Sequence, residues 1–196
     1  MLKHPLVFSV FHTPQLNAML NESFRKKKAL AEKCLEEKDY RAYVWLHERP
    51  FRVYAIQGIE EEVKSDGFRF WWSLLGMVWQ DSENIWQNRD FWNHNLDVEG
   101  PKVGFMDRIE EDALAKLQFP LTVYRGHQRQ NKWGLSWSLM KPKARWFATR
   151  YDVECGDVTE IVVEREDALA YFISRGEEEI VVRPSSINRI KWRRRK

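Results

Sequence analysis

The hydrophobic positions in the first half of the chain recur at the spacing of amphipathic helices. The clearest set lies between residues 14 and 35 and comprises Leu16, Leu20, Phe24, Ala31 and Leu35. A second helix is expected over residues 40–48 with Asp39 as its N-cap, and Pro50 can open a third. We therefore expect the first hundred residues to be helical.

A fourth helix is expected after a turn at residues 66–67, where Asp precedes Gly. Large apolar side chains share one of its faces: Trp72, Leu75, Trp79 and Trp86. We interpret this stripe as packing core, with stacking on bases or sugars as the alternative. The polar run at residues 81–84 is either the exposed end of this helix or a patch that contacts a nucleotide or a target.

The pattern changes near residues 100–101, Gly-Pro. A short helix is expected from Asp107 to Leu117 and another at about residues 142–150. The remaining runs predict strands at residues 121–125, 133–138, 158–164, 179–183 and 187–192. The expected fold is α+β, with a helical N-terminal region, residues 1–100, packed on a mixed β-sheet core, residues 101–196, as one compact unit.

Composition adds limits on the class of protein. The chain has 196 residues, of which 43% are hydrophobic and 31% charged, as in soluble globular domains. No apolar run approaches the roughly 20 residues of a membrane span, and the first residues do not form a secretory signal. Two cysteines, Cys34 and Cys155, cannot make a four-cysteine zinc site, and the five histidines lack metal spacing. We expect a cytoplasmic protein without metal or membrane association.

The net charge of +3 is unevenly distributed. The last eight residues include six cations, and without those six charges the chain has a net charge of −3. Two interpretations of the tail Arg189–Lys196 stay open: a solvated terminus, or a contact with the phosphates of a nucleic acid. Neither GxGxxG nor GxxxxGK[ST] occurs, so a nucleotide would be bound without a Rossmann fold or a P-loop.

Three short motifs in the second half suggest chemistry. The first is Val-Tyr-Arg-Gly at residues 123–126, the second is Ser-Trp-Ser at residues 136–138, and the third is Glu-Glu-Glu at residues 177–179. Strand alternation puts the two serines on one face, and likewise the first and third glutamates. Taken singly, each motif is better explained by an ordinary strand or a solvated turn.

In this order and spacing, the motifs resemble the arginine–serine–glutamate branch of the ADP-ribosyltransferase family. The resemblance covers roughly residues 120–185, and residues 141–148 resemble the helix that follows the serine strand in that family. Trp137 departs from the pattern, because the family commonly has Thr there. The resemblance implies an ADP-ribosyltransferase core that uses NAD as substrate and places one ADP-ribose on a macromolecular acceptor.

The resemblance also implies the catalytic residues. Glu179 would stabilise the positive charge that builds on the ribose as nicotinamide leaves. Glu177 would orient or deprotonate the acceptor, and a glutamate there implies a protein arginine as acceptor. Ser136 would brace the catalytic carboxylate or the nicotinamide ribose.

Further residues are expected to bind NAD. Arg125 would pair with its pyrophosphate or ribose, and Gly126 would bring the backbone close to nicotinamide. Ser138 would support the site by capping the next helix, beside Ser136 and Glu179. The guanidinium, hydroxyl and carboxylate are expected to converge on one crevice. The structural alternatives are a salt bridge for the arginine and an ordinary strand hydroxyl for the serine.

The aromatic residues near the motifs have two interpretations each. Tyr171 and Phe172 either meet the target or pack in the core, and Trp133 and Trp137 either stack on NAD or are buried. His127 follows the arginine motif and could reach an NAD phosphate.

Two other functions stay open. An NAD glycohydrolase would use water as the acceptor on the same scaffold. An inactive module would bind nucleic acid or protein through the basic tail. The intact motif set favours the transferase, and the compact architecture is typical of a bacterial or phage enzyme.

Overall fold

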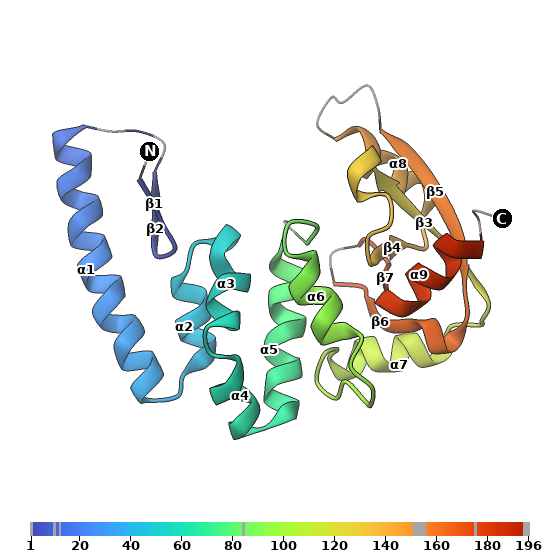
Figure 1. Cartoon of the computed structure of the whole chain (residues 1–196), viewed down its shortest axis with the longest axis horizontal. Coiled ribbons are helices and arrows are strands. Elements are labelled where there is room, and N and C mark those ends of the chain that lie inside the picture. Colours follow the sequence, from blue (N-terminus) through green and yellow to red (C-terminus); the bar gives the residue numbers. More distant parts are fainter. Residues whose placement is uncertain are drawn as a thin grey trace. The chain divides into compact units, whose positions relative to one another are not determined.

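The computed structural model describes residues 2–9, 11, 13–83, 85–150, 156–174 and 176–193. Within them the fold is α+β, as the sequence predicted (Figure 1). The chain divides into two compact units, Met1–Ile85 and Trp86–Lys196. The division lies before residue 100, where the sequence pattern changes. Residues 86–100 of the predicted N-terminal region therefore belong to the unit that contains the larger sheet.

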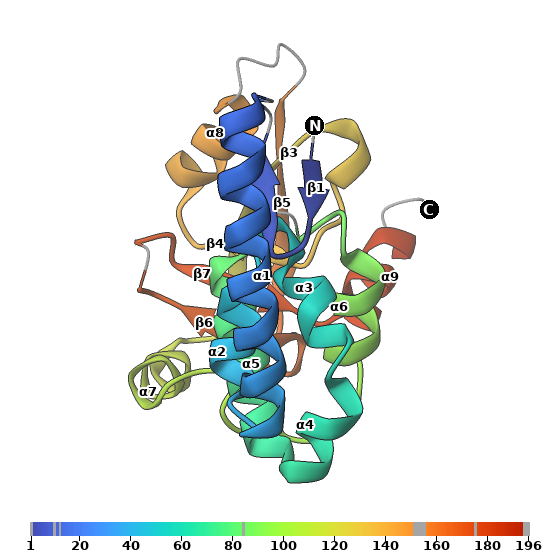
Figure 2. The same cartoon turned by 90° about the vertical axis from the view of Figure 1, so that its left-hand side faces the viewer.

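The first unit begins with a short antiparallel hairpin and continues as helices. Its elements are β1 Leu2–His4, β2 Val7–Ser9, α1 Pro14–Glu36, α2 Tyr40–Leu46, a 3₁₀ turn Arg49–Phe51, α3 Arg52–Gln57, α4 Glu60–Asp66 and α5 Phe68–Asp81. The hairpin is fastened to α1, because Lys27 Nζ donates to the Leu6 carbonyl oxygen at 2.8 Å. Figure 2 shows α1 along its whole length.

Local sequence signals fix the ends of these helices. The Thr13 hydroxyl accepts a hydrogen bond from the Leu16 amide at 3.1 Å and caps α1. The Asp39 carboxylate accepts from the Ala42 amide at 3.0 Å and caps α2, as predicted. Gly67 separates α4 from α5 with φ of 147°, a conformation that a side chain would disfavour. The first two predicted helices and the turn are therefore confirmed. The third begins at Arg52, after a 3₁₀ turn that contains Pro50, and the β1-β2 hairpin was not predicted.

The tryptophan stripe of α5 is core. Trp72 and Trp79 are 7% and 2% exposed, and Leu75 is fully buried. The expected fourth member, Trp86, lies beyond the end of α5 at Asp81. Packing of large side chains therefore explains the stripe within the helix.

The second unit is built on a five-stranded sheet of order β5-β3-β4-β7-β6. Its strands are β3 Leu121–His127, β4 Ser136–Ser138, β5 Asp157–Val163, β6 Ala168–Phe172 and β7 Glu179–Val182. Its helices are α6 Arg89–Leu96, α7 Arg108–Lys116, α8 Lys141–Thr149 and α9 Pro184–Arg193. Every pairing among these strands is antiparallel, so the expectation of a mixed sheet was wrong.

The last of these elements, α9, was predicted to be a strand at residues 187–192. Its isoleucines suggested a strand, but Pro184 fits the first turn of a helix. Helical spacing also places Ser186 and Arg189 together, and both bond the buried carboxylate of Asp167. Burial of Ile187, which is 3% exposed, completes the contact of α9 with its unit.

Two glycines let α8 lie directly on the sheet. A Cβ at Gly126 of β3 would stand 1.8 Å from the Ala144 carbonyl oxygen, and one at Gly156 would stand 1.9 Å from that of Ala148. Both alanines are buried. Small residues on both sides therefore set the position of α8 against β3 and β5 (Figure 1).

Helices that could span a membrane do not occur within the described ranges, because none is both long and apolar enough.

Candidate functional site

Three motifs that are distant in the sequence lie on neighbouring strands. β4 lies between β3 and β7, and Ser138 is the register partner of both Tyr124 and Glu179. Residues directly opposite in antiparallel strands project from the same face of a sheet. Tyr124, Ser138 and Glu179 therefore form a row on one face, which brings the serine motif beside the acidic motif.

Ser138 holds the acidic loop to the start of α8. Its hydroxyl donates to the Glu177 carbonyl oxygen at 2.6 Å and accepts from the Met140 amide at 3.0 Å. The Leu139 amide donates to the Glu178 carbonyl oxygen at 3.0 Å. Ser138 is 7% exposed, so these bonds are shielded from water.

The acidic triplet is a turn that leads into a strand. β7 begins at Glu179, and Glu178 has φ of 45°, in the left-handed region. Strand alternation therefore does not extend to Glu177, and the argument that placed it on one face with Glu179 fails. All three carboxylate residues are partly buried.

Ser136 is partly buried and lies opposite Val181 in β7. It is two residues from Ser138 on one strand, so the two serine side chains share a face, as alternation predicted. Its main-chain carbonyl oxygen accepts a hydrogen bond of 2.7 Å from Arg125 Nη1. The arginine and serine motifs are thus joined through the backbone of β4.

The guanidinium of Arg125 is directed at main-chain oxygens. Besides its bond to Ser136, its Nε donates to the Asn131 carbonyl oxygen at 3.0 Å, and the group packs against Gly134. Burial lowers the pKa of Arg125 to about 10, partly offset by the charge of Glu179. Arg125 therefore stays cationic at neutral pH and clamps β4.

Strand alternation puts the Arg125 side chain on the face opposite Tyr124. The row formed by Ser138 and Glu179 shares the face of Tyr124. The structure thus brings the three motif strands together. The Arg125 guanidinium hydrogen-bonds main-chain oxygens there, and it is close enough to Glu179 for that charge to raise its pKa.

Gly126 and His127 end the arginine motif in packed surroundings. The close approach at Gly126 is to the backbone of α8, which accounts for a glycine there. His127 is 5% exposed, and its Nε2 hydrogen-bonds the Thr159 hydroxyl at 2.7 Å. Burial lowers the pKa of His127.

The aromatic residues near the motifs form core. Tyr171, Phe172 and Trp137 are 8%, 3% and 1% exposed. The Trp137 indole donates to the Gly134 carbonyl oxygen at 2.9 Å, and Phe172 meets the Phe105 ring edge-on with centroids 5.5 Å apart. For these three, burial is the interpretation that holds, while Trp133 is partly buried.

Sequence reasoning missed Lys141, the first residue of α8. Its Nζ lies 5.3 Å from the centre of the Tyr124 ring and 3.6 Å from Glu160 Oε2. It thereby places a cation beside the row that contains Ser138. Its position three residues after Ser138 is the signal that could have identified it.

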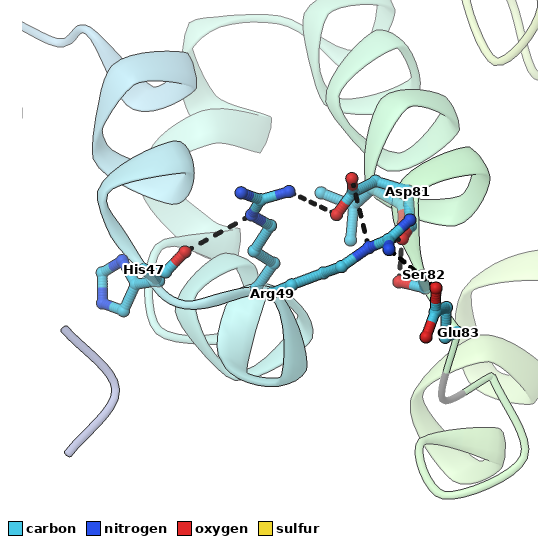
Figure 3. A network of polar contacts seen from close by, with 7 residues as sticks. His47, Arg49, Asp81, Ser82 and Glu83 are labelled. Carbon is cyan, nitrogen blue, oxygen red and sulfur yellow. Dashed lines mark hydrogen bonds and ion pairs between the residues drawn. The ribbon is translucent and has the colours of Figure 1, made fainter. Parts of the chain in front are cut away.

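The polar run at residues 81–84 lies at the end of α5 in the first unit. Of its two interpretations, the structure supports the end of a helix. The carboxylate of Asp81 pairs with Arg52, and Arg49 donates to the Asp81 carbonyl oxygen at 2.6 Å and to Glu83 at 2.7 Å. Figure 3 shows Arg49 reaching Asp81 and Glu83 at this helix end. Asn84 lies outside the described residues.

One cation of the basic tail forms an ion pair within its own unit. Arg189 belongs to α9 and pairs with Asp167, whose side chain is 3% exposed. Trp192 is 58% exposed. Residues 194–196 and Cys155 lie outside the described residues.

Among the described residues, no three His, Cys, Asp or Glu side chains form a group that could hold a metal ion. Comparisons with protein families, with curated proteins and with solved structures found no match for this chain. Function is therefore inferred from its own residues.

Proposed function

We propose that this protein is a mono-ADP-ribosyltransferase that moves ADP-ribose from NAD to an arginine side chain of a protein. One observation carries the proposal. The strands that contain Arg125, the serine motif and Glu179 are neighbours in one sheet, although they are far apart in the sequence. Their order along the chain is that of the arginine–serine–glutamate enzymes, and Ser138 lies directly opposite Glu179.

In the proposed reaction, the bond between ribose C1′ and the nicotinamide nitrogen breaks. The bonding electrons leave with nicotinamide, so positive charge develops on the ribose. The Glu179 carboxylate stabilises that charge more than it stabilises intact NAD, which lowers the barrier. Its partly buried position strengthens the effect, because less water screens the carboxylate.

The acceptor then completes the transfer. A guanidine nitrogen of the target arginine attacks C1′, a new C–N bond forms, and Glu177 takes the proton that this nitrogen loses. The hydrogen bond from Ser138 to the Glu177 carbonyl oxygen holds the backbone of this loop in place. Ser136, on the face of Ser138, supplies a hydroxyl to the nicotinamide ribose.

Arg125 acts as a positioning residue in this proposal. Its bonds to the Asn131 and Ser136 carbonyl oxygens hold β4 against β3. Gly126 likewise acts through structure, because it lets α8 seat on the sheet immediately after the serine strand.

The test uses the full chain, a cell lysate and NAD labelled in its adenylate phosphate. The wild type is expected to attach label to protein, in a product that protease digests and nuclease leaves intact. Glu179→Gln should lose this labelling, because the charge is removed while the shape is kept. Glu178→Gln, in the same triplet, serves as the matched control and should retain it. Labelling that survives in Glu179→Gln would overturn the proposal.

Release of nicotinamide without labelled macromolecule would also contradict the transferase and favour a glycohydrolase. Label on nucleic acid would contradict the protein acceptor while leaving the cleavage of NAD in place.

A further inference from the structure

Helix α8 presents cations and aromatic rings on its outward side. Its inner side consists of Ala144 and Ala148, which are buried against Gly126 and Gly156. The helix contains no acidic residue. Four residues outside that inner side, the α8 surface, combine two cations with two aromatic rings: Lys143, Arg145, Trp146 and Phe147. Arg145 and Trp146 are exposed, and Lys143 and Phe147 are partly buried. This face is held rigidly, because the close backbone contacts leave α8 little room to shift.

The aromatic part of the α8 surface is open to solvent. Trp146 is 54% exposed, although an indole is among the largest side chains. Its ring meets that of Phe147 edge-on, with centroids 5.0 Å apart. Phe147 is partly buried, so Trp146 is the ring of this pair that is open to solvent.

Cations lie over these rings. Lys143 Nζ is 5.3 Å from the centre of the Trp146 ring and 5.9 Å from that of Phe147. Arg150, one residue beyond the helix end, has its Cζ 5.9 Å and 5.0 Å from the same two rings. Cation–π contacts of this kind hold positive charge beside an aromatic face.

The charge on the α8 surface is not matched by carboxylates of the described residues. Lys141 pairs with Glu160 at 3.6 Å, but no ion pair with a described residue joins Lys143 or Arg145. The surface therefore complements a partner that carries negative charge. The exposed indole requires in addition that this partner have flat, apolar faces.

We propose that the α8 surface binds single-stranded nucleic acid. Phosphates would pair with Lys143 and Arg145, and an unpaired base would stack on Trp146. An acidic protein would use the cations without the indole, and a duplex keeps its base faces covered. A single strand uses both features. The inference rests on α8 alone and does not depend on the NAD chemistry.

Fluorescence anisotropy tests this proposal with the full chain and with labelled oligo(dT) and oligo(U) of roughly 15 nucleotides, near the upper end of the site sizes of single-strand-binding OB folds. Trp146→Ala is expected to raise Kd by about tenfold or more on both strands. Lys143→Gln should flatten the dependence of log Kd on log salt by about 0.7. A duplex of the same length should bind more weakly than either single strand.

Two variants serve as matched controls. Trp192→Ala removes a tryptophan of similar exposure from α9, and Lys26→Gln removes an exposed lysine from α1. Both should bind within about twofold of the wild type. Absence of binding at low salt, or equal binding by Trp146→Ala and the wild type, would overturn the proposal. Weakening by Trp192→Ala in place of Trp146→Ala would overturn it too, and would assign binding to the tail.

Discussion

Ser138 joins the serine motif to the acidic motif through one hydrogen bond, 2.6 Å from its hydroxyl to the main-chain carbonyl oxygen of Glu177. The same hydroxyl accepts a hydrogen bond from the amide of Met140, immediately before α8. A single small side chain therefore fixes both the turn before β7 and the start of the helix that carries the α8 surface.

Ser138→Ala is expected to lower the free energy of unfolding by about 1–3 kcal/mol, because the carbonyl and the amide both lose a shielded partner. Urea denaturation measures it. The exposed Ser185→Ala, in the same unit, should change stability by no more than about 0.5 kcal/mol. Equal stability of Ser138→Ala and the wild type would show that these bonds do not hold the loop.

Gly126→Ala should destabilise the fold by about 3 kcal/mol or more, because the new methyl group would stand 1.8 Å from the Ala144 carbonyl oxygen and push α8 off the sheet. Gly58→Ala is the matched control. A Cβ there meets nothing closer than 3.5 Å, so Gly58→Ala should leave the free energy of unfolding unchanged or raise it by up to about 1 kcal/mol. Thermal unfolding measures the stability of both variants. A Gly126→Ala variant as stable as the wild type would contradict the packing of α8 on the sheet.

His127 is expected to make stability depend on pH. Burial lowers its pKa below the ordinary 6.5, so below pH 6.5 the unfolded chain binds the proton more readily than the folded chain. The contribution of neutral His127 to the free energy of unfolding is fully present above pH 6.5. It is lost as the pH falls below that value. Between pH 7.5 and pH 5, His127→Gln should therefore lose less stability than the wild type. Parallel urea-midpoint curves would contradict this.

Asp81→Asn should destabilise the first unit by about 1–3 kcal/mol, because it weakens a half-buried pair with Arg52 and leaves a guanidinium short of its partner. Asp90 pairs with Arg89 at 3.7 Å, but its side chain is 89% exposed. Asp90→Asn should cost no more than about 0.5 kcal/mol. Guanidinium denaturation distinguishes the two, and equal effects would show that burial does not strengthen the network.

Local signals in the sequence were enough to predict most elements. Thr13 and Asp39 act as caps where the pattern placed helix starts, and Asp107 caps α7 in the same way. The α9 helix was missed because its isoleucines suit either structure. Its helical state depends on Asp167, a partner that spacing along the chain does not reveal.

The site was predictable at the level of strands and less so at the level of side chains. The sequence placed each of the three motifs on a strand or at the start of one. The fold then makes those three strands neighbours. The direction of Arg125 depends on carbonyl oxygens at Asn131 and Ser136, which carry no sequence signature. The turn at Glu178 likewise depends on backbone conformation that glutamate rarely adopts.

Nicotinamide release from NAD tests the central claim most directly. The wild-type chain, Glu179→Gln and Glu178→Gln are compared in the same assay, each with its folded state checked by circular dichroism. The account predicts release by the wild type and by Glu178→Gln, and a fall of about 100-fold or more in Glu179→Gln, the loss typical of removing one charge-stabilising group. Release by folded Glu179→Gln at the rate of the wild type, or none by the wild type, would contradict it.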